Sequence, residues 1–227
     1  MQPLVLLFDI DGTLISTGGA GNRAIVAAFA ELHGRPDATA HFKFGGMTDR
    51  AIAREGLRTI GKPDSSADIE ALLAAYVRAL QKELTTTVGH RVHQGIFPAL
   101  LAAETRADCA IGLGTGNVRE GARAKLLPVS LHHRFSFGGF GCDHEDRAEL
   151  IKVGQARGAE KLGRAVSDVR TVVIGDTPKD ITAAHANGAF ALAVATGGFT
   201  ESELRACGAD LAVADLSVAG ALAALLA

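Results

Sequence analysis

The fold is decided by residues 4–14, Leu4-Val5-Leu6-Leu7-Phe8-Asp9-Ile10-Asp11-Gly12-Thr13-Leu14, in which a short apolar run leads directly into two carboxylates. A continuous apolar run of this length is typical of a strand buried on both faces of a parallel sheet. Similar runs recur along the chain, and longer helical patterns separate them. They span residues 110–115, 135–140, 171–175 and 190–196. This alternation predicts an α/β fold, with a mainly parallel sheet covered by helices on both faces.

Residues 16–93 do not continue the alternation. They contain three helical patterns with Gly/Ser/Thr-rich joins at each end and no convincing strand between them, at residues 22–33, 49–60 and 67–84. The simplest interpretation is an all-α domain inserted after the first strand. The predicted division is a core of residues 1–15 and 94–227, with residues 16–93 as the insertion.

Composition disfavours several classes of function. The 227 residues are 48% hydrophobic and 21% charged, which suits a folded protein with a sizeable core. The 23 Lys and Arg against 25 Asp and Glu give a formal charge of -2, so we expect neither nucleic acid nor a membrane as a partner. The apolar stretches are too short to cross a bilayer. Three cysteines without a C-x-x-C pair fit neither a disulfide framework nor a zinc knuckle, and they predict a cytoplasmic protein.

Polar residues follow three of the predicted strands. Asp9 and Asp11 follow the first, Thr115-Gly116-Asn117 follow the second, and the segment from Asp176 to Asp180 follows the fourth. Ligands of open α/β sheets bind outside the carboxyl ends of the strands, so we expect these residues to share one site. Carboxylates gathered there repel one another unless a cation intervenes. Asp9, Asp11 and Asp176 could supply oxygens to Mg²⁺, which is therefore the expected cofactor.

The Asp9-x-Asp11 pair suits phosphoryl transfer. In an extended segment both side chains point the same way, and Gly12 allows the chain to turn sharply after them. One carboxylate can attack a phosphoryl group to form an aspartyl-phosphate. The other can protonate the leaving oxygen and then deprotonate the attacking water. The spacing alone leaves open which aspartate takes which role.

Three segments resemble motifs of the haloacid-dehalogenase-like hydrolase superfamily. They are DIDGTL at residues 9–14, the strand end at Thr115, and GDTPKD at residues 175–180. The helical insertion also resembles the C1 cap of the phosphoglycolate-phosphatase-like branch, with residues 44–49 similar to its substrate-facing loop. The resemblance implies a Rossmann-like three-layer core with an inserted cap. It also implies a Mg²⁺-dependent phosphatase for a small phosphomonoester, such as phosphoglycolate or a sugar phosphate.

The resemblance implies roles for individual residues. Asp9 would be the nucleophile and a metal ligand, and Asp11 would be the acid/base and bind the metal through its backbone carbonyl. Thr115 would hold the transferring phosphoryl group, and Asp176 would complete the metal site. Asp180 would lie beside that site, steering a metal-bound water or a core lysine. The implied substrate-binding residues are Gly12, Thr13, Gly46, Thr48, Gly116 and Asn117.

One position departs from the superfamily pattern. A lysine is usual after the third strand, whereas residues 142–147 read Cys-Asp-His-Glu-Asp-Arg. Arg147 is the expected catalytic replacement, because a guanidinium can pair with phosphoryl oxygens through two bonds. Lys152, about one and a half helical turns further on, is the alternative.

Several of these residues also have purely structural interpretations. Asp180 falls at the third position of a helix that begins after Thr177, where a carboxylate caps the helix. Asn117 and Thr48 are equally good N-caps. Asp49 would favour the dipole of the helix that it begins. The pattern leaves both interpretations open at these positions.

Two other functions use similar residues. A phosphomutase of the β-phosphoglucomutase type would form the same intermediate and return the phosphoryl group to a substrate hydroxyl. A non-catalytic phosphate-binding module would hold the phosphoryl group without turnover, although its acidic residues are expected on different strands. A dehalogenase is disfavoured because a departing halide needs no proton from Asp11. The expected partner is a small phosphorylated metabolite, and the expected oligomeric state is a monomer or homodimer.

Overall fold

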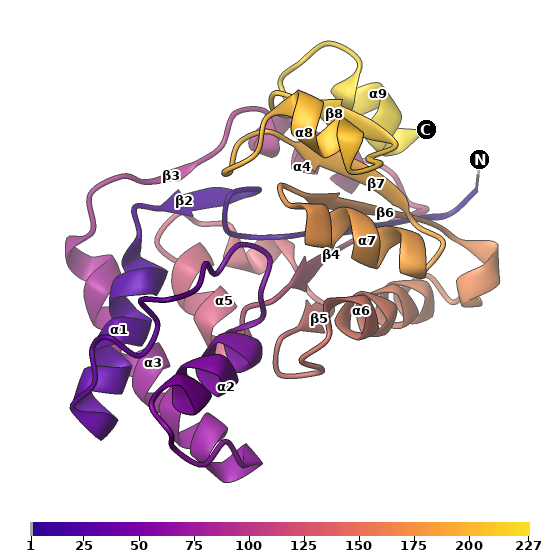
Figure 1. Cartoon of the computed structure of the whole chain (residues 1–227). Coiled ribbons are helices and arrows are strands. Elements are labelled where there is room, and N and C mark those ends of the chain that lie inside the picture. The colour runs from indigo at the N-terminus through magenta and orange to yellow at the C-terminus, as the bar shows by residue number, and fades with distance from the viewer. Residues whose placement is uncertain (1) are drawn as a thin grey trace.

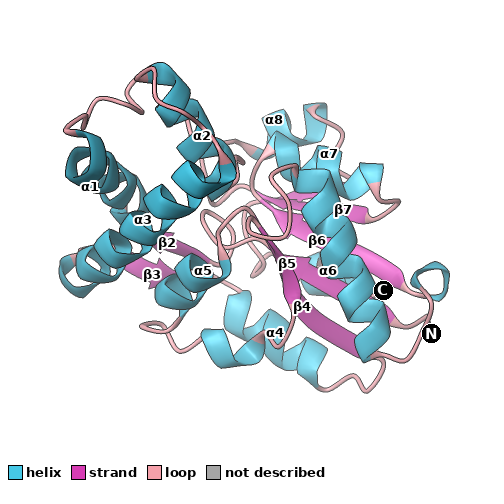
Figure 2. Cartoon of the chain, turned by 90° about the horizontal axis from the view of Figure 1, so that it is seen from below, coloured by secondary structure: helices cyan, strands magenta, loops and turns pink. Residues whose placement is uncertain are grey.

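A six-stranded parallel sheet forms the centre of the computed structural model, which describes residues 2–227. The strand order is β5-β4-β1-β6-β7-β8. Figure 2 shows the sheet in magenta among the helices. The strands are β1 (Leu4–Phe8), β4 (Cys109–Thr115), β5 (Gly138–Phe140), β6 (Arg170–Gly175), β7 (Phe190–Val194) and β8 (Leu211–Val213). Leu6 of β1 lies opposite Ile111 of β4 and Val172 of β6. The first apolar run of the sequence is therefore a central strand.

Helices cover both faces of the sheet and give the core three layers (Figure 1). Leu4, Leu6 and Phe8 pack into one hydrophobic cluster, and Val5 and Leu7 pack into another on the opposite face. This division follows from the two-residue period of a strand. The helices of the first face are α4 (Ile96–Glu104), α5 (Arg119–Leu126) and α9 (Ala221–Leu226). Those of the second are α6 (Arg147–Lys161), α7 (Pro178–Ala186) and α8 (Glu201–Ala206). The predicted three-layer α/β class is confirmed.

Residues 16–93, called the helical module below, contain α1 (Ala20–His33), α2 (Asp49–Thr59) and α3 (Ser66–Thr86). These three helices lie to one side of the sheet in Figure 1 and share a hydrophobic cluster of their own. Phe29, Leu57 and Leu72 are fully buried in it. Burying each such side chain stabilises the fold by about 1.5–3 kcal/mol. Because these residues belong to their own cluster, the module has a hydrophobic core separate from the clusters beside the sheet.

A small antiparallel ribbon links the helical module to the core. It pairs β2 (Ile15–Thr17) with β3 (His90–Val92), so both predicted domain boundaries fall at this ribbon. Neither strand was predicted from the sequence. Each is three residues long and carries polar side chains, which is too little for a periodic hydrophobic pattern.

Two predicted elements begin later in the chain than expected, because irregular backbone precedes each of them. The strand expected from residue 135 begins only at Gly138, after a 3₁₀ turn at His132–Arg134. The helix expected from Asn117 begins at Arg119, and Val118 is its N-cap. Asn117 is therefore not the N-cap residue, and its side chain is available for other contacts.

The C-terminal segment contributes β8 and α9 to the core, and the short strand β8 was also missed from the sequence. Leu225 of α9 is fully buried against the sheet. Within residues 2–227, every helix falls short of the length and apolar content that a membrane span needs. Cys109, Cys142 and Cys207 are free thiols.

Close approach of β5 to α6 leads to a stability prediction at Gly139. A Cβ atom added there would lie 1.8 Å from the backbone oxygen of Leu150. Because backbone atoms must move to relieve this overlap, Gly139→Ala is expected to lower the free energy of unfolding by at least about 2 kcal/mol. Urea denaturation measures the change, and Gly198→Ala is the control because a Cβ there meets nothing within 4 Å. Equal stability of the two variants would contradict the packing described here.

Candidate active site

The loops that follow β1, β4 and β6 meet at the carboxyl edge of the sheet. Asp9 and Asp11 follow β1, and the chain then turns through Gly12, which has a φ of +82°. A Cβ at Gly12 would lie 2.4 Å from Oδ2 of Asp176, the residue that follows β6. Glycine is therefore needed both for the left-handed backbone and for the space that Asp176 occupies.

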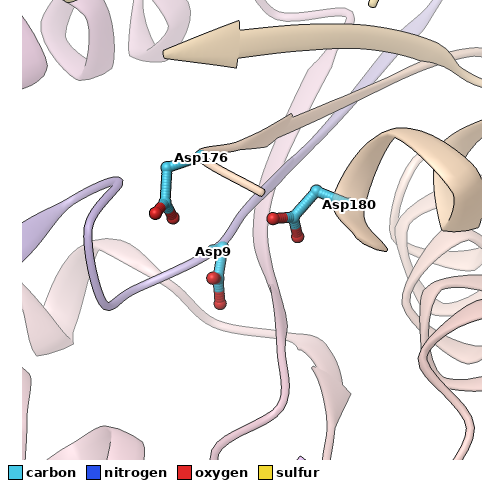
Figure 3. Close-up of side chains that lie close together, drawn as sticks. All are labelled: Asp9, Asp176 and Asp180. Carbon is cyan, nitrogen blue, oxygen red and sulfur yellow. The ribbon is translucent and has the colours of Figure 1, made fainter. Parts of the chain in front are cut away.

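Asp9, Asp176 and Asp180 form a buried acidic cluster. Figure 3 shows their side chains converging on one space, and carboxylate oxygens of the three lie within 4.8 Å of one another. Burial, followed by the charges of Asp180 and Asp9, raises the pKa of Asp176 to about 8. Burial also raises the pKa of Asp9 to about 6, although the charge of Arg147 works in the opposite direction. The raised pKa values mean that the positive charge of Arg147 does not fully balance the negative charges of the three carboxylates.

Mg²⁺ fits this donor set. It prefers carboxylate oxygens and commonly binds through one or two carboxylates together with substrate phosphate. Thr13 Oγ1 donates a hydrogen bond of 3.0 Å to Oδ1 of Asp176 and fixes that carboxylate. A Cβ at Gly197 would lie 1.8 Å from Oδ2 of Asp176, so a second glycine makes room for it. Thr13 therefore orients the carboxylate of Asp176, which is a candidate metal ligand.

Arg147 is the cation beside the acidic cluster. It is the first residue of α6, which is capped by the side chain of Asp146 accepting from Ala148 N at 2.7 Å. Its Nη2 atom is 2.9 Å from Oδ2 of Asp9, and its Nε donates to Oδ1 of Asp180 at 2.8 Å. The alternative, Lys152, is 67% exposed. The structure thus brings Arg147 and not Lys152 to the predicted nucleophile.

Asp180 combines the two interpretations that the sequence left open. Its Oδ2 accepts from Thr177 N at 3.0 Å and from Thr177 Oγ1 at 2.6 Å, which forms a capping box for α7. Its Oδ1 faces Arg147. One oxygen therefore stabilises the helix, and the other orients the guanidinium.

Asp11 lies in a separate hydrogen-bond network. Lys125 Nζ donates to Oδ2 of Asp11 and to Oδ1 of Asn117, both at 2.6 Å. Asn117 Nδ2 donates at 2.9 Å to Oδ2 of Asp11 and to Oγ1 of Thr115. Although burial works to raise the pKa of Asp11, the charge of Lys125 and these hydrogen bonds lower it. The two aspartates of the Asp-x-Asp pair therefore have different electrostatic surroundings.

The helical module closes over these groups. Asp49 N donates to Gly116 O at 2.8 Å, and Oδ2 of Asp49 accepts from Val118 N at 2.8 Å. Thr48 caps α2 by accepting from Ala51 N, and its hydroxyl donates to the backbone oxygen of Glu145 at 3.0 Å. The carboxylate of Glu145 also pairs with Arg54 of the module at 3.0 Å. Hydrogen bonds and one ion pair thus hold the module against the core.

A cavity of about 270 Å³ lies between the helical module and the strand ends. Its charged and amide lining from the core is Asp9, Asp11, Asn117, Lys125, Arg147 and Asp176. Of the residues that the resemblance implies for substrate binding, Gly46, Gly116 and Asn117 line this cavity. Gly12, Thr13 and Thr48, together with Thr115, are absent from its walls in the described part of the chain. The volume suits a small ligand, because pockets for drug-sized molecules span about 300–1,000 Å³.

The family follows from a match across most of the chain. A model described as haloacid dehalogenase-like hydrolase matches residues 4–188, which includes β1, the helical module and β6. The chain belongs to the haloacid dehalogenase-like hydrolase family. The resemblance seen in the sequence is confirmed at this level. A search of the curated proteins finds no match.

Solved structures share the fold of this haloacid dehalogenase-like hydrolase. CbbY from Rhodobacter sphaeroides, solved with phosphate, superposes with a TM-score of 0.73 at 20% identity, covering 100% of each chain. A protein from Lactobacillus delbrueckii provisionally named phosphoglycolate phosphatase gives 0.64 at 16% identity, covering 99% of each chain. One from Bacteroides vulgatus provisionally named beta-phosphoglucomutase gives 0.64 at 18% identity, covering 99% of this chain and 90% of the other. At these identities the similarity shows the fold alone.

Lys125 of this haloacid dehalogenase-like site was given no role from the sequence, although Lys125-Leu126 resembles a core segment of the family. It lies in α5 and is buried, with Gly121, Ala122 and Leu126 on the same buried face. A signal was present, because a lysine at helical spacing within an apolar stripe needs a buried partner. That partner is Asp11, and the amide of Asn117 bonds both Lys125 and Asp11.

Proposed function

We propose that the protein is a Mg²⁺-dependent phosphatase that hydrolyses a small phosphomonoester through an aspartyl-phosphate. One observation carries the proposal: two aspartates at the end of β1 are held in different environments within one cavity. Asp9 lies in the acidic cluster beside Arg147, whereas Asp11 is bonded to Lys125 and Asn117. Different surroundings for paired carboxyl groups are the physical basis for different catalytic roles.

In the first step, a carboxylate oxygen of Asp9 attacks phosphorus while the bond from phosphorus to the alcohol oxygen breaks. Arg147, 2.9 Å from Asp9, stabilises the negative charge of the transferring group. Asp11 gives a proton to the leaving oxygen. Before substrate binds, Lys125 favours the ionised form of Asp11. The negative charge of a bound phosphoryl group raises the proton affinity of Asp11, so that it takes up from water the proton that it then gives to the leaving oxygen. The product alcohol leaves, and Asp9 carries the phosphoryl group.

In the second step, water attacks the phosphorus of the aspartyl-phosphate. Asp11 takes a proton from that water, the bond between Asp9 and phosphorus breaks, and orthophosphate leaves. Lys125 favours the ionised form of Asp11 that this step needs. The helical module, held by Asp49 and Thr48, keeps bulk water away from the intermediate.

Asp9, Asp176 and the backbone carbonyl of Asp11 would hold Mg²⁺, with Asp180 beside them. When bound, the ion would neutralise carboxylate charge so that an anionic phosphoryl group can approach Asp9. The separation of the three carboxylates of the cluster and the raised pKa of Asp176 support this assignment. Phosphoglycolate and sugar phosphates are the substrate classes implied by the sequence resemblance.

Phosphate release from a broad panel of small phosphomonoesters, with and without Mg²⁺, tests the proposal. Multiple turnovers with release of orthophosphate are expected, and they would exclude a non-catalytic phosphate-binding module. An isomerised sugar phosphate without orthophosphate would instead indicate a mutase, which uses the same intermediate. Absence of turnover on every ester of the panel would contradict a phosphatase of small esters.

Metal dependence gives a prediction at Asp176. Chelation with EDTA is expected to abolish phosphate release, and added Mg²⁺ is expected to restore it. Asp176→Asn removes one charged ligand, so the Mg²⁺ concentration for half-maximal rate should rise by at least about tenfold. Asp168→Asn is the control, because Asp168 is exposed and lies outside the acidic cluster. An unchanged Mg²⁺ requirement in Asp176→Asn would remove Asp176 from the metal site.

A further inference from the structure

The cavity that would receive the substrate already holds an excess of negative charge. Four carboxylates line it, those of Asp9, Asp11, Asp49 and Asp176, against two cations, Lys125 and Arg147. When all four carboxyls and both cations are ionised, the formal charge of the lining is minus two. A bound Mg²⁺ would cancel this excess and leave the phosphoryl group as the anion that the site accommodates.

Both cations are already paired. Arg147 contacts Asp9 and Asp180, and Lys125 is bonded to Asp11 and close enough to Asp49 for its charge to affect that carboxyl. Both cations therefore already have carboxylate partners before a second anion on the substrate could reach them. A second negative group in the cavity would lose its hydration without gaining a counterion, which is costly.

The wall contributed by the helical module adds no cation. In the described part of the module, no Lys, Arg or His lines the cavity. The module side chains that do so are mostly apolar or uncharged, and Asn22, Ile25, Phe44, Met47, Ile52 and Tyr76 are among them. Two arginines of the module form ion pairs outside this lining, Arg54 with Glu145 and Arg23 with Glu83.

Asp49 is the charged side chain of this module wall. It begins α2, is 8% exposed, and uses Oδ2 to accept from Val118 N. Burial raises its pKa to about 6, although the charge of Lys125 lowers it, so the carboxyl is ionised at pH 8. The module therefore contributes a negative charge to the wall of the cavity.

We propose that the site selects small phosphomonoesters whose alcohol part carries no negative charge, and that Asp49 is the residue that sets this preference. The inference rests on the proposed phosphatase function and narrows its substrate class. Neutral and cationic alcohols fit the lining, because Asn22 and the Tyr76 hydroxyl can bond polar groups and Asp49 attracts a cation. Phosphoglycolate and sugar bisphosphates, which carry a second anion, fit it poorly.

Three esters of nearly equal size test the proposal: 2-phosphoglycolate, 2-hydroxyethyl phosphate and 2-aminoethyl phosphate. They differ at the end of the chain by a carboxylate, a hydroxyl and an ammonium group. With saturating Mg²⁺ at pH 8, kcat/KM for the hydroxyethyl and aminoethyl esters should exceed that for 2-phosphoglycolate by at least about tenfold, since opposed like charges are strongly unfavourable.

Asp49→Asn tests the assigned residue. The amide oxygen can still accept from Val118 N, so the docking contact is kept while the charge is removed. The ratio of kcat/KM for aminoethyl phosphate to that for 2-phosphoglycolate should fall by at least about tenfold, mainly through KM. Asp37→Asn is the matched control, because Asp37 is an exposed carboxylate of the module paired with Arg35. An unchanged ratio in Asp49→Asn would overturn the role of Asp49.

The outcomes separate this inference from the proposed function. If wild-type protein turns over all three esters but prefers 2-phosphoglycolate, the charge preference is wrong and the phosphatase assignment stands. If it hydrolyses none of the three, nor p-nitrophenyl phosphate, in the presence of Mg²⁺, the phosphatase assignment itself fails. The wild-type comparison does not depend on the folding of any variant.

Discussion

Asp9→Asn is expected to abolish Mg²⁺-dependent phosphate release, with kcat lowered by at least about 10⁴-fold, as when other enzymes lose their nucleophile. The amide of asparagine cannot form the aspartyl-phosphate. The substitution also removes one charge from a cluster in which the carboxyls repel one another, so the fold should be retained. Phosphate release measures the activity, and circular dichroism with urea denaturation measures the fold.

Covalent trapping gives the control for this prediction. Acid-quenched wild-type protein should contain a peptide with Asp9 that carries the added mass of one phosphoryl group, and the Asp9→Asn protein should not. Asp37→Asn, which alters an exposed carboxylate of the helical module, should turn over as the wild type does. Substantial turnover by Asp9→Asn, or a phosphoryl group on another residue, would show that Asp9 is not the nucleophile.

The sequence was sufficient to predict the central sheet and its acidic edge. β1 is continuously apolar and runs directly into Asp9 and Asp11, and Asp176 follows another such strand. Because carboxyl ends of parallel strands lie along one edge, the grouping of these carboxylates follows from the strand pattern. The short strands β2, β3 and β8 could not be found in this way, since three residues do not establish a period.

Other features of the site depend on side-chain directions that no spacing rule supplies. Asn117 looked like a helix cap, but the helix begins two residues later and its amide bonds Asp11 and Thr115 instead. Thr48 caps α2, yet its hydroxyl also reaches the backbone of Glu145 across the module boundary. The Lys125 network and the charge balance of the cavity wall likewise appear only once helices from distant parts of the chain are packed together.

Substitution of Arg147, the cation at the start of α6, is expected to have the second large effect on activity. Arg147→Met is expected to lower kcat by about 10³-fold or more, because the transferring phosphoryl group loses its guanidinium, an effect comparable with removal of an arginine finger. Without Mg²⁺ it should also lower the free energy of unfolding by about 3–5 kcal/mol, because Asp9 and Asp180 keep their buried charges without a partner. Steady-state phosphate release and urea denaturation measure the two effects.

Arg147→Lys separates charge from geometry. A lysine restores one positive charge but not the contacts that the guanidinium makes with Asp9 and Asp180 together, so activity should recover to within about 100-fold of wild type. Lys152→Met should leave kcat and stability close to those of wild type, because that side chain is 67% exposed and lies near Glu149. If Lys152→Met lost activity while Arg147→Met kept it, the cation of the reaction would be Lys152. The buried guanidinium would then serve only to balance the acidic cluster, and the rate would not depend on it.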